Sequence, residues 1–143
     1  MKRVFVALMA LAATGAQAPG GADLQVELSG LRSTKGVVHL CLTSSAKRFL
    51  ECKEDHTAIA RTIPASRAAK LDLGPVRPGT YALLIVHDEN NNGRLDMTLG
   101  IPREGFGFSN NPAMRPRPPH WDEIHFTMPP KATQQEVRIR YVL

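Results

Sequence analysis

Short segments with alternating apolar and polar residues recur along this chain, and glycine or proline residues separate most of them. Residues 23–29, 123–128 and 136–142 each place apolar side chains at every second position. This period of two puts one set of side chains on each face of an extended strand, whereas a helix needs a period of about 3.6. These segments therefore predict β-strands that bury one face.

Further segments also favour strands, namely residues 36–43, 57–63, 69–73 and 81–87. The last is apolar at odd and even positions alike, which is typical of a central strand that is covered on both sides. No segment has a long helical pattern, and the 11 glycines and 11 prolines favour many turns. The sequence predicts an all-β fold: a single Greek-key antiparallel β-sandwich of about seven strands, Ig-like or transthyretin-like, with one long loop after the central strand.

The N-terminus has the pattern of a signal peptide rather than of folded structure. Two basic residues precede an apolar run over residues 4–13, and an Ala-Gln-Ala sequence ends at position 18. The run is too short to span a membrane. We therefore predict a signal peptide over residues 1–18, with cleavage between positions 16 and 22. The remaining residues, 19–143, leave room for one β-sandwich domain.

An exported chain of this kind is expected in the periplasm or outside the cell. No second apolar run follows the signal peptide, so no membrane span is expected. Removing the signal peptide lowers the formal net charge from +5 to +3, because Lys2 and Arg3 leave with it. The remaining basic residues are scattered rather than clustered, so no nucleic-acid partner is expected.

The chain has two cysteines, Cys41 and Cys52. In an oxidising compartment a lone pair of cysteines predicts a structural disulfide. A redox-active role would need the C-x-x-C spacing, which these two positions lack. A bridge across 11 residues is expected to stabilise the fold by roughly 3 kcal/mol.

The sequence Val-Arg-Pro-Gly-Thr-Tyr at residues 76–81 places a Pro-Gly turn just before the predicted central strand. Proline presets its own backbone angle and glycine accepts positive φ, so both favour a tight turn. The hydroxyl of Tyr81 can then reach back to the backbone upstream, as in the tyrosine corner of Greek-key sandwiches. The alternative is an ordinary turn followed by a core tyrosine.

The segment that follows His87 has the fewest features of a structural strand or a short turn. The 33 residues from 88 to 120 have little strand pattern, and a loop of that length is unusual in a small domain unless it is functional. Oxygen-bearing side chains stand at alternate positions around Gly93, as at the start of a calcium-binding loop. The candidate calcium ligands are Asp88, Asn90, Asn92, the carbonyl of Arg94, Asp96 and Glu104.

This segment departs from an EF-hand in two respects. Neither flank has a helical pattern, and Leu99 occupies the position of the bidentate glutamate that closes an EF-hand loop. Glu104 is the nearest carboxylate that could replace it. Any affinity for calcium is therefore expected to be weak, about 10⁻⁴–10⁻³ M. The alternative is a polar turn closed by hydrogen bonds from its own Asn and Asp side chains, without a metal.

Glycine and phenylalanine alternate over residues 105–108, and we expect them to fold the chain tightly over the end of the sandwich. Residues 115–119 are rich in proline and predict extended chain. Of the five histidines, His87 is the one at the mouth of the long loop. The others are expected on solvated strand faces or in loops: His39, His125, His56 and His120.

The pattern HDEN-x-NG-x-LD, which begins at His87, is followed by GIP-x-EG-FGFSN, which begins at Gly100. This combination resembles the bacterial family called domain of unknown function 2141 (DUF2141), and the resemblance spans nearly all of residues 19–143. It implies a small exported protein but no established activity. More loosely, the strand after Gly36 and the Pro-Gly-Thr-Tyr turn are similar to transthyretin-like and carboxypeptidase-regulatory-like sandwiches, which mostly serve as binding or accessory modules.

These observations favour a non-enzymatic binding or accessory domain of the cell envelope, with residues 88–111 as its functional surface. Its partner would be an envelope protein, a glycan or a small molecule, and its only expected cofactor is Ca²⁺. The alternative is a metal-dependent or acid–base hydrolase that uses His87, Asp88 and Glu104. A third interpretation is a purely structural envelope protein.

Overall fold

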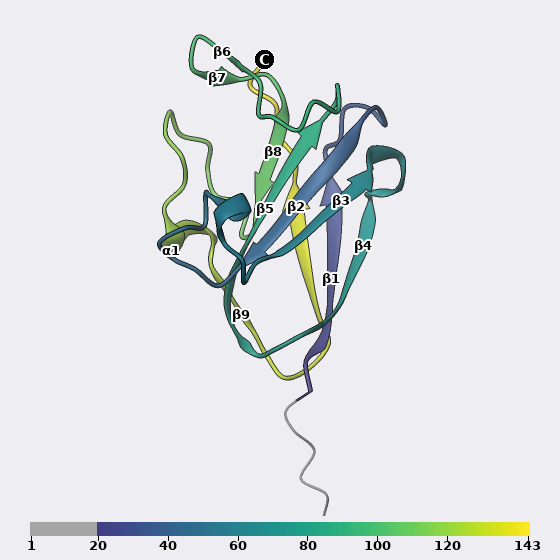
Figure 1. Ribbon diagram of the computed structural model, residues 1–143, viewed down its shortest axis with the longest axis vertical. Helices are drawn as coiled ribbons and strands as arrows, with labels where there is room; N and C mark the ends of the chain where they lie inside the picture. The colour runs from purple at the N-terminus through teal and green to yellow at the C-terminus, as the bar shows by residue number, and fades with distance from the viewer. Residues whose placement is uncertain (1–19) are drawn as a thin grey trace, which may run out of the picture.

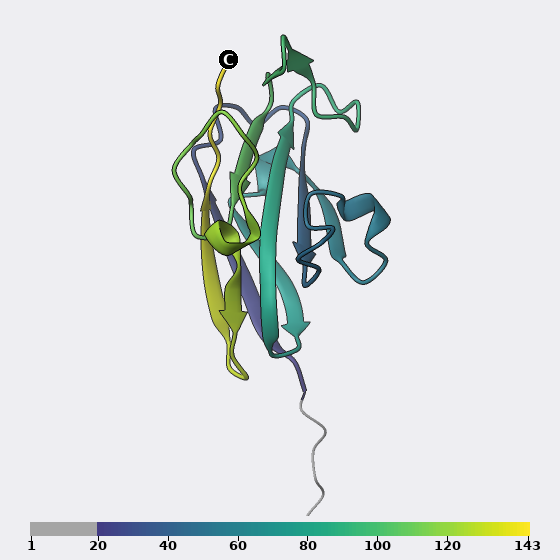
Figure 2. The same ribbon diagram turned by 90° about the vertical axis from the view of Figure 1, so that its left-hand side faces the viewer.

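The computed structural model describes residues 20–143, and the predicted signal peptide at 1–18 lies outside the described residues. Two β-sheets face each other and run roughly along the long axis of the molecule (Figures 1 and 2). The first sheet has the strand order β10 (Thr133–Arg138), β1 (Ala22–Ser29), β4 (Lys70–Val76). The second has the order β3 (Ile59–Pro64), β2 (Val37–Thr43), β5 (Gly79–Asp88), β8 (Gly105–Phe108), and β9 (Phe126–Met128) pairs with the start of β5.

The core lies between the two sheets and is built from alternate residues of the facing strands. Each aliphatic side chain that is fully buried there contributes about 1.5–3 kcal/mol. Core residues include Leu24, Val26 and Leu28 of β1, Val38, Leu40 and Leu42 of β2, Leu83 and Ile85 of β5, and Val137 and Ile139 at the end of the chain. The all-β sandwich predicted from the alternation is confirmed.

The strand count and one strand direction differ from the prediction. The described residues form ten strands rather than about seven, and β10 pairs with β1 in parallel. Three of the ten, β6 (Met97–Thr98), β7 (Ile101–Pro102) and β8, lie in the segment predicted as one long loop. β6 and β7 form a hairpin that projects from the end of the molecule where the C-terminus lies (Figure 1).

A helical turn, α1 (Trp121–Ile124), replaces the first half of the strand predicted over 123–128. The Glu123 carboxylate accepts the backbone N–H of His120 at 2.7 Å, which satisfies a donor that would otherwise be free at the start of the turn. Two short 3-10 turns, η1 (Cys52–Glu54) and η2 (Ala65–Arg67), complete the structure. None of the helices in residues 20–143 is long and apolar enough to cross a membrane.

β8 is the edge strand of the second sheet, and its two glycines pack against the end of the chain. A Cβ atom at Gly105 would lie 2.4 Å from Cε1 of Tyr141, and one at Gly107 would lie 2.7 Å from Cγ1 of Val137. No larger residue fits in either position without a shift of its neighbours. The alternating Gly-Phe sequence therefore forms a strand with glycines inward and phenylalanines outward, and the prediction of a loop here is wrong.

The outward face of β5 is only partly covered. Leu84 and Val86 are half-buried there, and Phe108 and Phe106 of β8 lie opposite them in the pairing register. The two phenylalanine rings pack with their centroids 5.9 Å apart. The expectation that β5 is covered on both sides therefore holds for the inner face alone, and an apolar strip remains accessible on the outer face.

Two local predictions are confirmed. Cys41 of β2 and Cys52 of η1 form a disulfide with their Cα atoms 6.1 Å apart. The hydroxyl of Tyr81 donates to the carbonyl oxygen of Arg77 at 3.0 Å, which is the hydrogen bond of a tyrosine corner. The first ties the segment after β2 to the sheet, and the second fixes the turn that starts β5.

Breaking the Cys41–Cys52 bridge is expected to lower the free energy of unfolding by about 3 kcal/mol, because the unfolded chain gains freedom when the loop opens. The Cys41→Ala/Cys52→Ala variant and the oxidised protein should be compared by urea denaturation. Intact mass should also place the non-reduced protein two hydrogens below the reduced chain. Reaction of the non-reduced protein with a thiol alkylating agent would contradict the bridge.

Candidate functional site

The candidate site begins at Asp88, where β5 ends and the chain turns out of the sheet. Its carboxylate is fully buried and accepts the backbone N–H groups of Asn92 (3.1 Å) and Gly93 (2.7 Å). His39 lies 3.2 Å from the second carboxylate oxygen. Burial alone would raise the pKa of Asp88, but the hydrogen bonds from Gly93, His39 and the following backbone outweigh it and hold that pKa below its usual value.

Local hydrogen bonds give the loop its shape. The side-chain oxygen of Asn90 accepts the N–H of Asn92 at 3.1 Å, and that of Asn92 accepts the N–H of Arg94 at 2.9 Å. Asn91 and Gly93 have positive φ angles of 56° and 71°, which asparagine and glycine tolerate better than other residues. The hydrogen bonds of the predicted polar turn are therefore present.

Asp96 stands opposite Asp88 across this turn. Its carboxylate accepts side-chain N–H groups from Asn90 (2.7 Å) and Asn92 (2.9 Å). These hydrogen bonds, first from Asn92 and then from Asn90, lower the pKa of Asp96. Asn92 thus connects the two acidic ends of the loop, because its backbone N–H donates to Asp88 and its side chain donates to Asp96.

Glu104, the residue directly before β8, places its side chain in the same site. Its side chain is 4% exposed, and one carboxylate oxygen accepts the N–H of Asp96 at 3.4 Å. The other oxygen meets no N–H or O–H donor among residues 20–143, although a protonated Glu104 can donate to the Asp88 carboxylate. Burial and then the nearby charge of Asp88 raise the pKa of Glu104 to about 7. A buried carboxylate that faces two others is stable only when it is protonated or when a cation neutralises the group.

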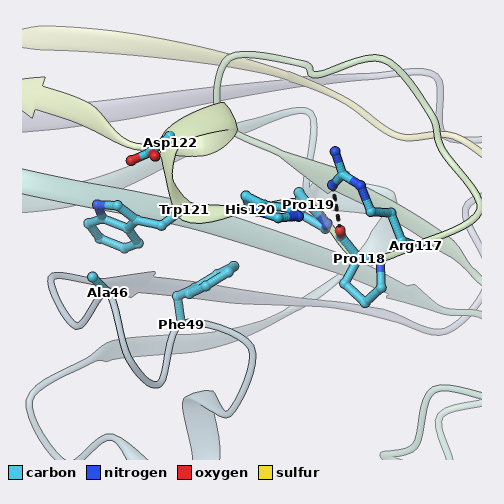
Figure 3. Close-up of a pocket in the computed structure, with 8 residues that line it drawn as sticks. All are labelled: Ala46, Phe49, Arg117, Pro118, Pro119, His120, Trp121 and Asp122. Carbon is cyan, nitrogen blue, oxygen red and sulfur yellow. Dashed lines mark hydrogen bonds between the residues drawn. The ribbon is translucent and has the colours of Figure 1, made fainter.

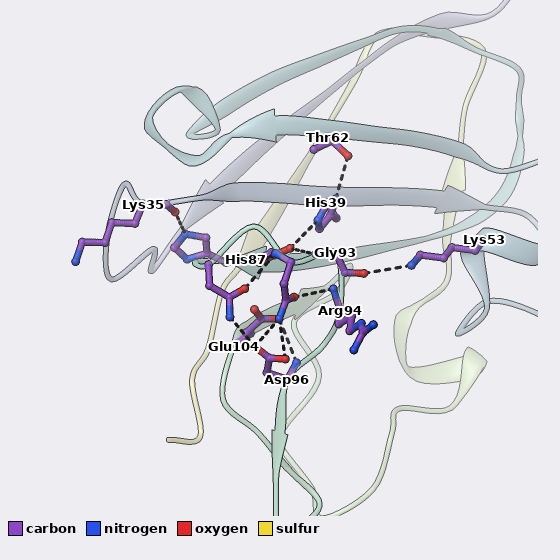
Figure 4. Close-up of polar contacts among 12 residues, drawn as sticks. Lys35, His39, Lys53, Thr62, His87, Gly93, Arg94, Asp96 and Glu104 are labelled. Atoms are coloured by element: carbon purple, nitrogen blue, oxygen red, sulfur yellow. Dashed lines mark hydrogen bonds and ion pairs between the residues drawn. The ribbon is translucent and has the colours of Figure 1, made fainter.

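The structure brings most of the predicted calcium ligands together. Figure 4 shows Asp96 and Glu104 side by side below Gly93. Within residues 20–143, no three His, Cys, Asp or Glu side chains are arranged so that they could hold a metal ion by themselves. A cation at this site would need oxygens from amide side chains or the backbone as well, and those of Asn90 and Asn92 in the same loop already accept backbone N–H groups.

His87 does not join this site, although it precedes Asp88 in the sequence. Consecutive residues of a strand point to opposite faces, and His87 is fully buried on the inner face. Its Nε2 donates to the carbonyl oxygen of Lys35 (2.8 Å), so its Nδ1 accepts from the hydroxyl of Tyr141 (2.6 Å). Figure 4 shows His87 turned toward Lys35. Of the residues named for a hydrolase, Asp88 and Glu104 converge and His87 does not.

His39 is the histidine at the site, and the sequence prediction of a solvated side chain missed its contacts. Its side chain is 36% exposed, its Nδ1 lies 2.9 Å from the hydroxyl of Thr62, and its Nε2 faces Asp88. The strand register explains this position, because Val37 pairs with Asp88 and His39 lies two residues further along the same face. An antiparallel pairing of 36–43 with 81–87 would have found it.

A second missed residue, Arg32, clamps the base of the loop. Its guanidinium contacts the Glu89 carboxylate at 2.6 Å and donates to the carbonyl oxygen of Arg103 at 3.2 Å. Arg32 also lies 4.2 Å above the ring of Tyr141. The hydrogen bond from Arg32 lowers the pKa of Glu89. No sequence pattern indicated this pairing, because 57 positions separate Arg32 from Glu89.

Away from this site, a hollow of about 560 Å³ lies between residues 46–49 and 117–122 (Figure 3). The Trp121 ring borders it, with the Phe49 ring edge-on at 5.8 Å. His125 stacks on Trp121 at 5.9 Å. These two rings cover part of the indole, and Trp121 as a whole is half-buried.

The sequence matches a family described as an uncharacterized protein conserved in bacteria (DUF2141), over residues 26–136. The chain belongs to this family. The match runs from β1 to β10 and includes the whole loop from Asp88 to Glu104, so the resemblance inferred from the loop pattern is confirmed. No curated protein and no solved structure matches the chain.

Tyr141→Phe is expected to lower the free energy of unfolding by about 1–3 kcal/mol, because it leaves the buried Nδ1 of His87 without a donor. Tyr81→Phe is the matched control: it also removes one hydroxyl and keeps the ring, but its hydrogen bond lies at the surface. We expect the control to cost at most about 1 kcal/mol. Urea denaturation measures both, and equal costs would contradict a buried hydrogen bond at His87.

Proposed function

We propose that this protein is an exported, non-enzymatic binding or accessory domain of the bacterial cell envelope, and that residues 88–111 form its functional surface. We further propose that a calcium ion bound by the start of this segment holds the surface in place. The ligands are oxygens of Asp88, Asn90, Asn92, Arg94, Asp96 and Glu104.

The buried carboxylate of Glu104 is the observation that carries the calcium proposal. A buried polar atom without a hydrogen-bond partner is rare in folded proteins and calls for an explanation. Glu104 has such an oxygen, and its neighbours Asp88 and Asp96 add negative charge rather than remove it. A hard cation with oxygen ligands would satisfy this oxygen and offset the repulsion together.

Calcium suits these ligands better than smaller or softer ions. Ca²⁺ accepts six to eight oxygens in flexible geometry, whereas Mg²⁺ demands a near-ideal octahedron and Zn²⁺ prefers nitrogen and sulfur. The three carboxylates of residues 20–143 at this site are not arranged to hold an ion by themselves, so neutral oxygens of the loop that contains Gly93 would have to complete the ligand set. The imperfect match to a calcium-binding loop leads us to propose a weak site, about 10⁻⁴–10⁻³ M.

The arrangement of these side chains favours binding over catalysis. The hydrolase alternative relies on His87 as an acid–base group beside Asp88 and Glu104. Both ring nitrogens of His87 are engaged in the interior, and both of His39 are engaged by Thr62 and Asp88. The hydrolase alternative therefore loses His87 as its acid–base residue.

Export is supported by features at two places in the chain. The N-terminal residues have the charge and apolar pattern of a signal peptide. The Cys41–Cys52 disulfide is compatible with an oxidising compartment such as the periplasm.

Calcium in millimolar concentration is expected to raise the thermal midpoint by roughly 4 °C, because a few-fold excess over Kd stabilises the native state by about 1 kcal/mol. Melts should be recorded with Ca²⁺, with Mg²⁺ and with chelator. The Asp88→Asn/Asp96→Asn variant is expected to lose the shift. A shift of equal size in that variant, or with Mg²⁺, would mean that the loop is an Asx-bonded turn without a specific ion.

Glu104→Gln tests the proposed site with a single substitution, because it removes one buried carboxylate and changes the size of the side chain very little. In chelator it is expected to melt at or above the wild-type temperature, since it removes a charge that faces Asp88. With Ca²⁺ it is expected to lose the shift. Glu54→Gln, at an exposed glutamate, is the matched control and should retain it. A Glu104→Gln protein that responds to Ca²⁺ like the wild type would remove Glu104 from the site.

A further inference from the structure

We infer that the outer face of the second sheet binds a single-chain anionic amphiphile, such as a long-chain fatty acid, in an apolar groove. The groove has a volume of about 710 Å³ and runs over β5 and β8. This size lies within the range of about 300–1,000 Å³ that is typical of small-molecule sites. The inference rests on the proposed role as a binding domain, but it does not depend on calcium.

The floor of the groove is the apolar strip on the outer face of the sheet. It is formed by Leu84 and Val86 of β5 and by Phe106 and Phe108 of β8. All four side chains are half-buried. Half-buried side chains that form a continuous strip in a hollow are typical of a surface that receives a ligand.

Two segments form the walls, and both add apolar surface. One wall is the β6–β7 hairpin, where Met97 is 51% and Ile101 is 38% exposed. The other is the proline-rich segment 112–119, where Met114 is 46% exposed. At the tip of the hairpin, beside the groove, Leu99 is 97% exposed and has a φ of 51°, which leucine rarely adopts. Apolar surface therefore continues from the groove to the end of the molecule.

The charge around the groove is positive. Four arginines and one glutamate line it. The glutamate, Glu123, is already paired with Arg117 at 2.8 Å and lies 3.8 Å from Arg115. Arg138 and Arg140 have no acidic partner in the part of the chain that the structure describes. Arg140 donates to the carbonyl oxygen of Pro112 at 3.1 Å, but neither guanidinium is neutralised by an acid among residues 20–143. An apolar hollow with two such guanidinium groups complements a ligand with an apolar chain and an anionic end.

A peptide fits this groove less well than an acyl chain. A peptide that adds to a sheet needs a free strand edge, but Phe106 of β8 already exchanges backbone hydrogen bonds with Arg140 at 3.0 and 2.9 Å. Beyond it, the Asn111 side chain bonds the backbone of Glu136 and Arg138. With this edge occupied, the groove offers apolar contacts and charge rather than backbone partners.

Oleate is the probe for the test, used below its critical micelle concentration and in the presence of chelator so that calcium does not precipitate it. Isothermal titration calorimetry is expected to show one oleate bound per chain. Met114→Glu and Arg138→Glu are each expected to weaken binding at least tenfold. Monoolein, which has the same chain without the charge, is also expected to bind at least tenfold more weakly. Thermal melts check that both variants, changed at exposed positions, remain folded.

Arg67→Glu, a charge reversal at an exposed position on η2, is the matched control and should bind oleate like the wild type. The inference is overturned if oleate does not bind, if all variants bind it equally, or if monoolein binds as tightly. Binding to anionic vesicles without binding of dispersed oleate would also overturn it, in favour of a membrane surface. Because the titration contains chelator, its failure leaves the calcium-dependent melts untouched, and failure of those melts leaves oleate binding untouched.

Discussion

The close packing of β8 against the end of the chain is the contact on which the rest of the structure depends. Gly105 and Gly107 carry no side chains. β8 therefore lies closer to Tyr141 and the neighbouring backbone than it could with larger residues at these two positions. That approach lets Phe106 and Arg140 exchange backbone hydrogen bonds. β8 therefore pairs with β5 in one sheet and also bonds to the continuation of β10 in the other, so it closes the sandwich along this edge.

The same contact places the features that carry both proposals. Glu104 directly precedes Gly105, so the position of β8 sets where this carboxylate enters the loop. Tyr141, which packs against Gly105, donates to His87 and thereby keeps that histidine in the core. The outward Phe106 forms part of the floor of the groove. The cation site at Glu104 and the apolar groove over Phe106 thus lie next to each other along one short strand.

The sequence predicted the strands in which apolar and polar residues alternate strongly. It failed for strands whose own side chains contribute little apolar surface and whose position depends on neighbouring residues. β1 and β2 were predicted because their own apolar side chains fill the core. β8 was not, because glycine contributes no hydrophobic signal. At the site, the motif spacing indicated the turn around Gly93 and named Glu104, but the place of His39 depends on the register of β2 against β5, which the alternation leaves open.

The loop at Asp88 and the groove both contact the β6–β7 hairpin, and this hairpin can couple binding at one to binding at the other. The N–H of Arg103, at the base of the hairpin, donates to the carbonyl oxygen of Asp96 at 2.9 Å. The hairpin between them forms one wall of the groove. An interaction that orders Asp96 therefore also restrains this wall. If an ion at the loop and a ligand in the groove both favour the ordered hairpin, each must increase the affinity of the other by the same factor, since coupling between two binding sites is reciprocal.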